Sequence, residues 1–345
     1  MSALLRLRRP DDWHVHLRDG AAMQAVLPHT AQRFARAIVM PNLLPPVTTT
    51  AAALAYRARI LAALPPGMTF EPLMTLFLTD ATTPDEIDRA CDSGRVFGAK
   101  FYPAGATTHS QSGVSDIRLL DATLVRMSER GLPLLVHGEV TDEHVDVFDR
   151  EACFIDAVLA PTVARHPRLR VVFEHVTTAA AVRFVADARD GVAATVTPQH
   201  LLMNRNALFA GGLRPHHFCL PVLKTEADRQ ALLQVIAAGN PRFFLGTDSA
   251  PHARGAKESA CGCAGIYSAH AGIELYAEIF ATHGMLPRLE DFASGFGADF
   301  YRLPRNASHI TLLREPWRPP ACYDFGGQEL VPLRTGEDIQ WRLSA

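Results

Sequence analysis

Three catalytic motifs are absent from this sequence. No Gly-x-Gly-x-x-Gly segment follows the first predicted strand, no Walker loop is present, and no Gly-x-Ser-x-Gly segment occurs. The first two motifs hold the phosphates of dinucleotides and nucleotides, and the third places a nucleophilic serine on a sharp turn. These absences argue against a dinucleotide-dependent enzyme, a P-loop enzyme and a serine hydrolase of the α/β-hydrolase type.

Long apolar runs and blocks of one charge are also missing. No run approaches the roughly 20 apolar residues that a membrane span requires. The first ten residues contain no apolar core followed by a cleavage site, so we expect no signal peptide and a cytoplasmic location. The 34 Lys and Arg residues nearly balance the 36 Asp and Glu residues, and no basic block stands out. We therefore expect no membrane and no nucleic acid as a partner.

Cysteine is scarce, with six residues in 345, and only Cys261 and Cys263 are close together. Cysteine-based zinc sites usually contain two such pairs or added histidines. We expect free thiols, as in a cytosolic protein of this size, and a packing role for this pair in its loop. A metal site made by this pair is the less favoured alternative, and its role stays open.

What the sequence does contain is a regular alternation of short apolar runs with longer amphipathic or Ala-rich runs. The short runs, bounded by Gly or Pro, are typical of buried parallel strands. The predicted strands are 12–17, 37–41, 71–78, 97–102, 133–137, 171–175, 193–197 and 242–247. The predicted helices are 21–35, 50–63, 84–93, 116–130, 150–165, 178–187, 226–238 and 269–283. Eight strands, each followed by a helix, predict an α/β fold of the (β/α)₈ TIM-barrel type. A doubly wound open sheet is the main alternative.

Three connections of this barrel are long, namely 103–115, 198–225 and 249–268. Each follows the carboxyl end of a strand, which is the face where barrel enzymes place their active sites. No linker divides the chain, so we expect one domain over 1–345. Its core barrel would cover about 11–300, and a short appended packing segment would cover about 301–345, with strand-like pieces at 329–333 and 339–343.

Polar residues close five of the apolar strands. His14 and His16 are two apart on the first strand, so their side chains point to the same side. An isolated His-x-His pair is more often two ordinary polar histidines. The other strand ends change this interpretation, because residues that suit a metal site close them as well. These residues are Lys100, His137, His175 and Asp248.

Lys100 requires a separate argument, because an ammonium group beside metal cations would be repelled. A buried lysine can lose its proton. The neutral amine can then take up CO₂ to form a carbamate, whose two oxygens can bridge two metals. An ordinary surface lysine after a short strand remains the alternative.

Neutral imidazoles combined with oxygen anions suit zinc, although cobalt or manganese can substitute. Two metals close together would hold a hydroxide near neutral pH and polarise a carbonyl group. Asp248 could bind a metal, take the proton of the attacking hydroxide and pass it to a leaving nitrogen. Arg18, Asn42 and His252 lie near the same rim and could grip a small carboxylate. Their alternatives are a surface salt bridge, a turn cap and a loop histidine.

Together these residues resemble the dihydroorotase family of the amidohydrolase superfamily, in its shorter, bacterial-type branch. The resemblance covers the chain from Asp11 to about Phe300. Its motifs are Asp12-Trp13-His14-Val15-His16-Leu17-Arg18-Asp19, Met40-Pro41-Asn42, Ala99-Lys100-Phe101-Tyr102-Pro103, Val136-His137-Gly138-Glu139, Glu174-His175 and Gly246-Thr247-Asp248-Ser249-Ala250-Pro251-His252.

The resemblance implies roles for these residues. His14, His16 and Asp248 would bind the more buried zinc ion, His137 and His175 the second, and carboxylated Lys100 would bridge both. The substrate-binding residues would be Arg18, Asn42, Thr107, Thr108, His137, Leu220, His252 and Ala264. Among these, Leu220 and Ala264 would act through their backbone on the amide edge of a pyrimidine, and the Thr107-Thr108 loop would close over the substrate. The family also implies a homodimer.

The resemblance further implies a reversible, metal-dependent cyclisation of N-carbamoyl-L-aspartate to L-dihydroorotate with loss of water, in de novo pyrimidine biosynthesis. In the hydrolytic direction, a hydroxide between the metals would attack the ring amide carbonyl, with Asp248 as general base and then general acid.

Three other functions remain as alternatives. A hydantoinase or allantoinase would share the metal cluster, but a neutral ring would not need Arg18, Asn42 and His252. A non-catalytic barrel would be expected to have lost at least one strand-end ligand, and none is missing. A metal-dependent deaminase usually lacks a lysine at the position of Lys100.

Overall fold

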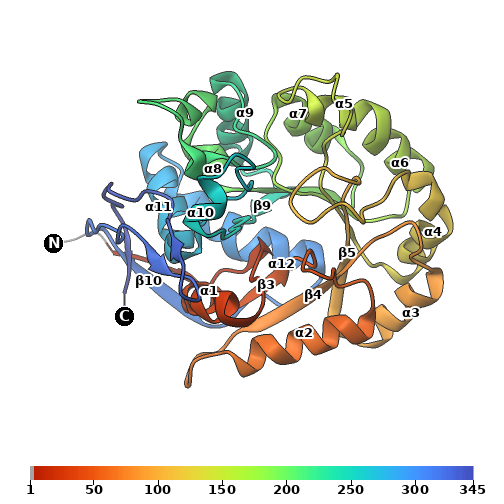
Figure 1. Ribbon diagram of the computed structural model, residues 1–345, viewed down its shortest axis with the longest axis horizontal. Coiled ribbons are helices and arrows are strands. Elements are labelled where there is room, and N and C mark those ends of the chain that lie inside the picture. Colours follow the sequence, from red (N-terminus) through yellow and green to blue (C-terminus); the bar gives the residue numbers. More distant parts are fainter. Residues whose placement is uncertain (1–3, 345) are drawn as a thin grey trace.

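A computed structural model describes residues 4–344. Its central feature is a ring of eight parallel strands in sequence order (Figure 1). The strands are β2 (Asp12–Val15), β3 (Arg36–Val39), β4 (Glu71–Phe77), β5 (Val96–Phe101), β6 (Leu134–Val136), β7 (Val171–Phe173), β8 (Val192–Val196) and β9 (Phe243–Leu245). The ring closes just beyond β2 and β9, where the Asp248 amide donates to the His14 carbonyl at 2.9 Å. The predicted barrel is confirmed, and the open sheet is excluded.

Helices surround the ring on its outside (Figure 1). The main ones are α1 (Gly20–Arg33), α2 (Thr50–Ala62), α3 (Pro84–Asp92), α4 (Asp121–Arg130), α5 (Arg150–Phe154), α6 (Ala160–Arg165), α7 (Ala179–Asp187), α9 (Glu226–Ala237) and α11 (Gly272–Thr282). Threonine side chains accept backbone amide hydrogens at the N-termini of four of them, which fixes where these helices begin. The four caps are Thr49, Thr83, Thr178 and Thr225.

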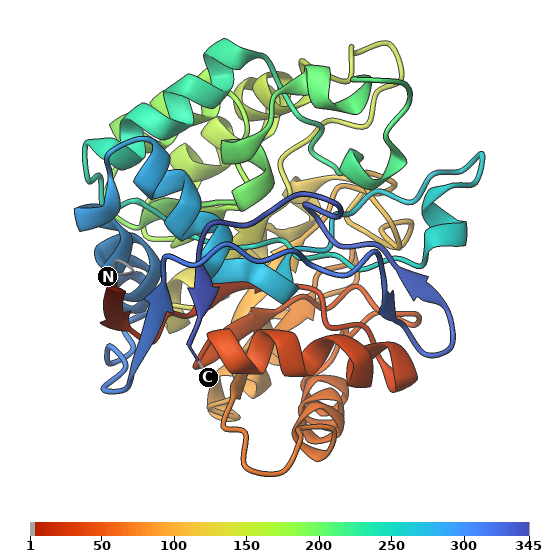
Figure 2. The ribbon, with the colours of Figure 1, turned by 90° about the vertical axis from the view of Figure 1, so that its left-hand side faces the viewer.

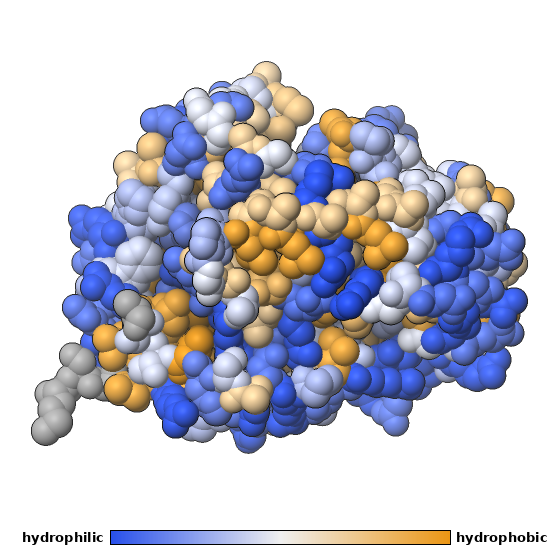
Figure 3. Space-filling model, turned by 90° about the horizontal axis from the view of Figure 1, so that it is seen from below, coloured by the Kyte–Doolittle hydropathy of each residue, from blue (hydrophilic) through white to orange (hydrophobic). Residues whose placement is uncertain are grey.

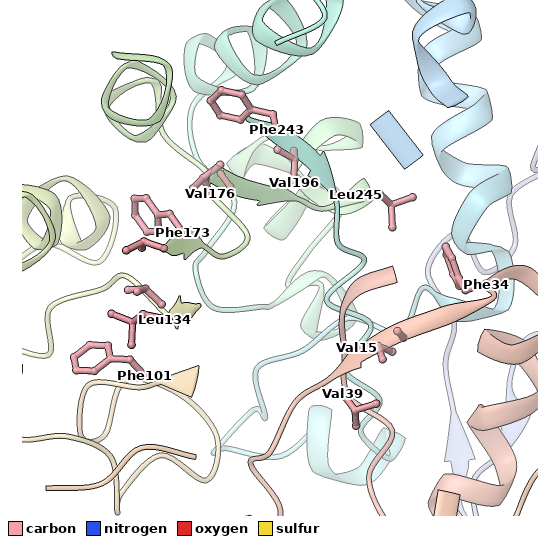
Figure 4. Packing of buried hydrophobic residues seen from close by; sticks show 14 of the residues in the cluster. Val15, Phe34, Val39, Phe101, Leu134, Phe173, Val176, Val196, Phe243 and Leu245 are labelled. Atoms are coloured by element: carbon pink, nitrogen blue, oxygen red, sulfur yellow. The ribbon is translucent and has the colours of Figure 1, made fainter. Parts of the chain in front are cut away.

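Alternate residues of the strands fill two separate layers. The outer layer packs strands against helices, and Figure 4 shows members of it, including Phe101, Leu134 and Phe173, on successive strands. The inner layer fills the barrel with side chains from most of the strands. Its buried residues are Trp13, Ile38, Met40, Leu73, Leu135, Val172, Ala193, Phe244, Ala298 and Tyr301. The same alternation places the next inward positions, among them Asn42, His137 and Glu174, at the carboxyl-end rim.

The two chain ends form small sheets, of which the sequence predicted only the strand-like pieces at 329–333 and 339–343. Strand β1 (Leu4–Arg8) pairs antiparallel with β10 (His309–Leu313), which in turn pairs with β13 (Arg342–Leu343). Figure 2 shows β1 beside β10 near the N-terminus. A separate hairpin joins β11 (Tyr323–Asp324) and β12 (Glu329–Leu330). Each of these two predicted pieces contains a strand of only two residues, β12 and β13, and the rest of its backbone is irregular.

Some predicted helices are also interrupted. Residues 150–165 contain a π-helical segment, η2 (Ile155–Leu159), between α5 and α6, and residues 116–130 begin with a 3₁₀ turn, η1 (Ile117–Leu120). The sequence analysis missed α12 (Phe296–Tyr301), which follows the π-helical segment η7 (Asp291–Gly295). Hydrophobic periodicity reports which face is buried, and it does not distinguish these tighter or wider turns from an α-helix.

The loop that contains Leu220 holds three short helices, α8 (Pro198–Leu202), η3 (Arg205–Leu208) and η4 (Pro215–His217), and the loop after β9 contains α10 (Arg254–Lys257). On the face shown in Figure 3, apolar residues lie in separate patches among polar ones. Within residues 4–344, no helix combines the length and the apolar character that a membrane crossing requires.

Candidate metal centre and substrate pocket

The residues that close the strands meet at the carboxyl-end rim. The Asp248 Oδ1 atom lies 3.4 Å from His14 Nε2 and 3.2 Å from His16 Nε2. Each of these three buried residues offers one potential metal-ligand atom, and these three atoms lie within 4.8 Å of one another. This spacing suits a single metal ion. The His175 ring centroid lies 5.0 Å from that of His14 and 4.9 Å from that of His137. The structure therefore brings the four predicted histidines and Asp248 together.

A second set of polar groups orients the histidine rings. The Nδ1 of His14 donates to Glu174 at 2.9 Å, and the Nδ1 of His16 donates to the Asn42 amide oxygen at 2.8 Å. In both rings the Nε2 atom therefore keeps a lone pair that can bind a metal ion, and both Nε2 atoms face Asp248. His137 has the opposite arrangement, because its Nε2 donates to Glu139 at 2.8 Å. Such partners fix ring tautomers at metal sites.

Asp12 joins the two strands at which the barrel closes. Its carboxylate accepts from the Thr247 amide at 2.8 Å, from the Thr247 hydroxyl at 2.6 Å and from the His14 amide at 3.1 Å. Burial raises the pKa of Asp12 to about 7.

Asp248 follows Thr247 with a φ of 44°, and His175 has a φ of 41°. Non-glycine residues with positive φ are strained, so the surrounding contacts must hold them in place.

Lys100 is fully buried. Within the described part of the chain, its Nζ has no hydrogen-bond partner, and neither has Nδ1 of His175. Burial lowers the pKa of Lys100 to about 8, so its neutral amine is accessible. Burial also lowers the pKa of His14, and it lowers those of His16 and His175 well below the usual range. These three histidines are therefore neutral electron-pair donors beside a carboxylate, which fits divalent metal ions.

A small pocket opens above this cluster. Every site residue predicted from the sequence lines it except Lys100, which lies buried beneath the rim. Tyr102, Ala250 and Gly265 also line the pocket and were not predicted. The Tyr102 hydroxyl is buried and unpartnered among residues 4–344.

One wall of the pocket is positively charged. Arg18 donates from Nη2 to His252 Nε2 at 3.0 Å and from Nε to the Pro251 carbonyl at 2.9 Å. Burial, together with the neighbouring Arg18 charge, lowers the pKa of His252 to about 2, so His252 is neutral and accepts from Arg18. The Arg18 backbone has a φ of 61°, and its carbonyl accepts from the buried Tyr56 hydroxyl. Asn42, by contrast, already bonds His16 and donates to the Thr108 carbonyl at 3.3 Å.

The loop 103–115 forms part of the pocket wall, because Thr107 and Thr108 line the pocket. The Thr107 amide donates to the Ser110 hydroxyl at 2.8 Å, and that hydroxyl donates back to the Thr107 carbonyl at 2.7 Å. At Gly113 an added Cβ would lie 2.5 Å from the Tyr102 carbonyl oxygen. The loop therefore folds back closely on the end of β5.

Sequence reasoning assigned no role to Asp12, Glu139, Glu174 or Thr195. The Thr195 hydroxyl donates to Glu174 at 2.6 Å, which completes the support of His14. The three acidic residues among these each lie one or two positions from a histidine of the cluster. This proximity is the sequence signal by which they could have been recognised as partners of the histidines. Their hydrogen-bond partners, such as Thr195 and Thr247, come from neighbouring strands.

Comparisons with known proteins agree with this geometry. Residues 12–312 match the model of the amidohydrolase family. A dihydroorotase of Laribacter hongkongensis is 64% identical over 99% of this chain and 99% of its own length. A dihydroorotase of Methylobacillus flagellatus is 63% identical over 99% of both chains. The crystal structure of a Campylobacter jejuni dihydroorotase superposes with a TM-score of 0.92 at 35% identity, over 100% of this chain and 98% of that one. The chain therefore belongs to the amidohydrolase family and, within it, to the dihydroorotases.

Proposed function

We propose that this pocket carries out the dihydroorotase reaction, with the residues described above in named roles. The reaction closes N-carbamoyl-L-aspartate to L-dihydroorotate with loss of water and also runs in reverse. One observation carries the assignment of the site: a cluster of four histidines, Asp248 and the unpartnered Lys100 lies beside the paired Arg18 and His252. The cluster fits metal-assisted hydrolysis, and the pair fits a carboxylic acid.

In this proposal two zinc ions occupy the cluster. His14, His16 and Asp248 would hold one, and His137 and His175 would hold the other. Lys100 would bridge them after its neutral amine adds to CO₂ and loses a proton, which forms a carbamate anion. The buried Nζ has no hydrogen-bond partner among residues 4–344, and this supports the step, since a buried amine without a partner is otherwise unfavourable. When bound, such ions acidify water and polarise a carbonyl group.

The chain's own residues move the proton. In hydrolysis, Asp248 would accept the proton of the attacking water, and its Oδ1 already lies between two imidazoles. The same carboxylic acid would then protonate the ring nitrogen as the amide bond breaks. In cyclisation the steps reverse: Asp248 takes a proton from the ureido nitrogen and returns it as water leaves.

Other residues would bind and orient the substrate. Arg18 and His252, with Asn42, would hold its carboxylate, and backbone groups of Leu220 and Ala264 would meet the amide edge. Thr107 and Thr108, in the loop that covers the pocket, together with His137, would complete the enclosure. A relative from Saccharomyces cerevisiae, 31% identical with a TM-score of 0.91, was solved in complex with 5-fluoroorotic acid, a pyrimidine carboxylic acid.

A different cyclic amide is the competing substrate class. An L-hydantoinase from Arthrobacter aurescens has the same fold, with a TM-score of 0.80, but only 16% identity. The Arg18–His252 pair favours the carboxylic acid, because a neutral ring leaves a buried guanidinium without an anionic partner.

The test is ultraviolet-monitored hydrolysis of L-dihydroorotate by the purified protein, with and without a zinc chelator. We expect turnover that the chelator abolishes and zinc restores. No turnover, in protein that carries about two metal ions per chain, would move the function to another cyclic amide. Turnover that survives complete metal removal would refute the metal assignment.

We also propose a single domain over 1–345 and a cytoplasmic location, both from the sequence pattern, and a homodimer, from the family resemblance. Light scattering on a size-exclusion column tests the dimer. A monomer mass at micromolar concentration would contradict it.

A further inference from the structure

Lys257, at the end of α10, is buried with only 3% of its surface exposed. Its Nζ donates to three backbone carbonyls: that of Phe218 at 2.7 Å, that of Cys263 at 2.9 Å and that of Gly265 at 2.7 Å. An ammonium group has three hydrogens, so these bonds use all of its donors. The side chain therefore acts as a single tie between two stretches of backbone.

Both stretches border the substrate pocket. Phe218 lies two residues before Leu220, and Cys263 and Gly265 flank Ala264. Leu220, Ala264 and Gly265 line the pocket. The Gly265 amide also donates to the Phe218 carbonyl at 3.0 Å, which brings the two stretches side by side. The position of Lys257 Nζ thus sets the spacing of the backbone on either side of the pocket wall.

The stretch around Gly265 has little room to move. Gly265 has a φ of 151°, and an added Cβ would lie 2.6 Å from the Ala250 carbonyl oxygen and 2.8 Å from Cδ2 of His252. The backbone that Lys257 holds is therefore packed directly against the carboxylate-binding wall. A displacement of this backbone would change the distance between the protein groups that bind the two ends of the ring.

The burial of Lys257 is unfavourable unless hydrogen bonds compensate it. Within residues 4–344, the hydrogen bonds of its Nζ all go to backbone carbonyls and none to a carboxylate, and burial lowers the pKa of Lys257 to about 8. Three carbonyl dipoles and the Phe218 ring, whose centroid lies 5.8 Å from Nζ, replace the lost water. An apolar residue of similar size would fill the same space without the cost of burying a charged group. It could not, however, donate hydrogen bonds that hold three backbone carbonyls in position.

We propose that Lys257 is a positioning residue that holds the backbone of Leu220 and Ala264 at the spacing required by the amide edge of a pyrimidine ring. It would govern recognition of the ring more than recognition of the carboxylate. This inference rests on the proposed function, which places the amide edge at Leu220 and Ala264.

The test compares two ligands in the zinc-loaded enzyme. Orotate has both the carboxylate and the amide edge, whereas succinate has carboxylates and no amide edge. In Lys257→Met we expect orotate binding to weaken by roughly 10- to 100-fold, as for a small misplacement of a binding group. Succinate binding should change by less than about twofold, since Arg18 is held by His252 and the Pro251 carbonyl and not by Lys257. The KM for dihydroorotate should rise more than kcat falls.

Arg254→Met is the matched control, because it removes a long basic side chain from the outer side of the same short helix, where Arg254 pairs with Glu329 at 2.8 Å. It should leave both affinities unchanged. Lys257→Gln, which keeps an amide donor and removes the charge, gives the same comparison with a milder change in the event that Lys257→Met does not fold.

Two results would overturn the inference. Orotate binding that stays at the wild-type value in a Lys257 variant would show that the tie does not position the ring. Equal weakening of orotate and succinate would show a general structural role only. The unaltered enzyme is measured before any variant. If it neither binds orotate nor hydrolyses dihydroorotate, that result refutes the proposed function itself and not the role of Lys257.

Discussion

At the scale of single residues, the proposed bridging role of Lys100 predicts that the site loses a metal ion when this lysine is removed. Its side chain is fully buried at the base of the cluster. We expect Lys100→Ala to lose the second metal and to lower turnover by more than about 100-fold, since even the loss of an outer-shell partner can have an effect of that size. A small carboxylic acid such as acetate should restore part of the activity by occupying the vacated space. Metal analysis and dihydroorotate hydrolysis measure both effects.

The contrary result for Lys100 is equally clear. If Lys100→Ala retained two metals and full activity, Lys100 would not bridge the ions. Arg95→Ala, which removes a half-exposed cation before β5, is a suitable control and should behave as the unaltered enzyme does.

Asp248 combines a metal-ligating position with the proposed proton transfer. In Asp248→Asn, the amide oxygen can still face His14 and His16, but the side chain can no longer accept a proton. We expect metal to be retained and kcat to fall by about 10²- to 10⁴-fold, the usual range for general acid–base catalysis. Single-turnover kinetics with parallel metal analysis would show this. An unchanged rate would refute the proton-transfer role.

Arg18 is expected to act on binding more than on chemistry. Its guanidinium is held by His252 and the Pro251 carbonyl, beside the space for a substrate carboxylate. Arg18→Met should raise the KM for dihydroorotate by roughly 10- to 100-fold, from the loss of about 1.5–3 kcal/mol for a charged hydrogen bond. Arg59→Met, at a half-exposed arginine that pairs with Asp19, is the control. A KM that stays unchanged in Arg18→Met would place the carboxylate elsewhere.

At the scale of elements, the barrel and the location of its site follow from sequence pattern. The strands are short and apolar because helices cover them, and five of them are closed by residues that do not belong in an apolar core. Lys100, His137 and Asp248 are examples. Since parallel strands present their carboxyl ends at one rim, these residues must come together, and they do.

Sequence pattern fails where a contact joins distant segments. Strand β1 pairs with β10, about 300 residues later, and this short segment of five residues forms a strand only through that distant partner. The partners of Glu174 and Asp12 are hydroxyls on neighbouring strands, and a local pattern does not specify them. The hydrogen bonds of Lys257 are a further case, because their acceptors are backbone carbonyls. Every residue has a backbone carbonyl, so the sequence does not indicate which ones accept these bonds.

The loop 103–115 yields a prediction at this scale. Gly113→Ala would place a methyl group 2.5 Å from the Tyr102 carbonyl oxygen, so the loop must move away from β5. We expect kcat/KM to fall by about tenfold or more while the metal content stays constant, since closing loops orient the substrate and exclude water. Gly255→Ala, at a glycine with open space around it, is the control. Equal kcat/KM values for the two variants would show that loop position does not limit the reaction.

At the scale of the whole molecule, buried histidines outside the metal cluster link stability to pH. His200 is buried between the Thr197 hydroxyl and the Pro221 carbonyl, and burial lowers its pKa from 6.5 to about 4. The unfolded chain therefore binds a proton near pH 6.5, whereas the folded chain does not until about pH 4. The stability contributed by neutral His200 is complete above pH 6.5 and is lost as the pH falls from 6.5 toward 4.

This linkage can be measured by comparing unfolding curves of the unaltered protein and His200→Gln between pH 7.5 and pH 5, each in metal-free form so that release of metal does not contribute. The free energy of unfolding should fall more steeply in the unaltered protein, by on the order of 2 kcal/mol over this interval, given 1.36 kcal/mol for each pKa unit. His309→Gln, at an exposed position on β10, is the control and should keep the steeper slope. Parallel slopes for the unaltered protein and His200→Gln would mean that His200 binds its proton in the folded state as readily as in the unfolded chain. In that case the acid sensitivity of the fold would have to come from other groups, of which His29, with its pKa lowered to about 4 by burial, is the next to test.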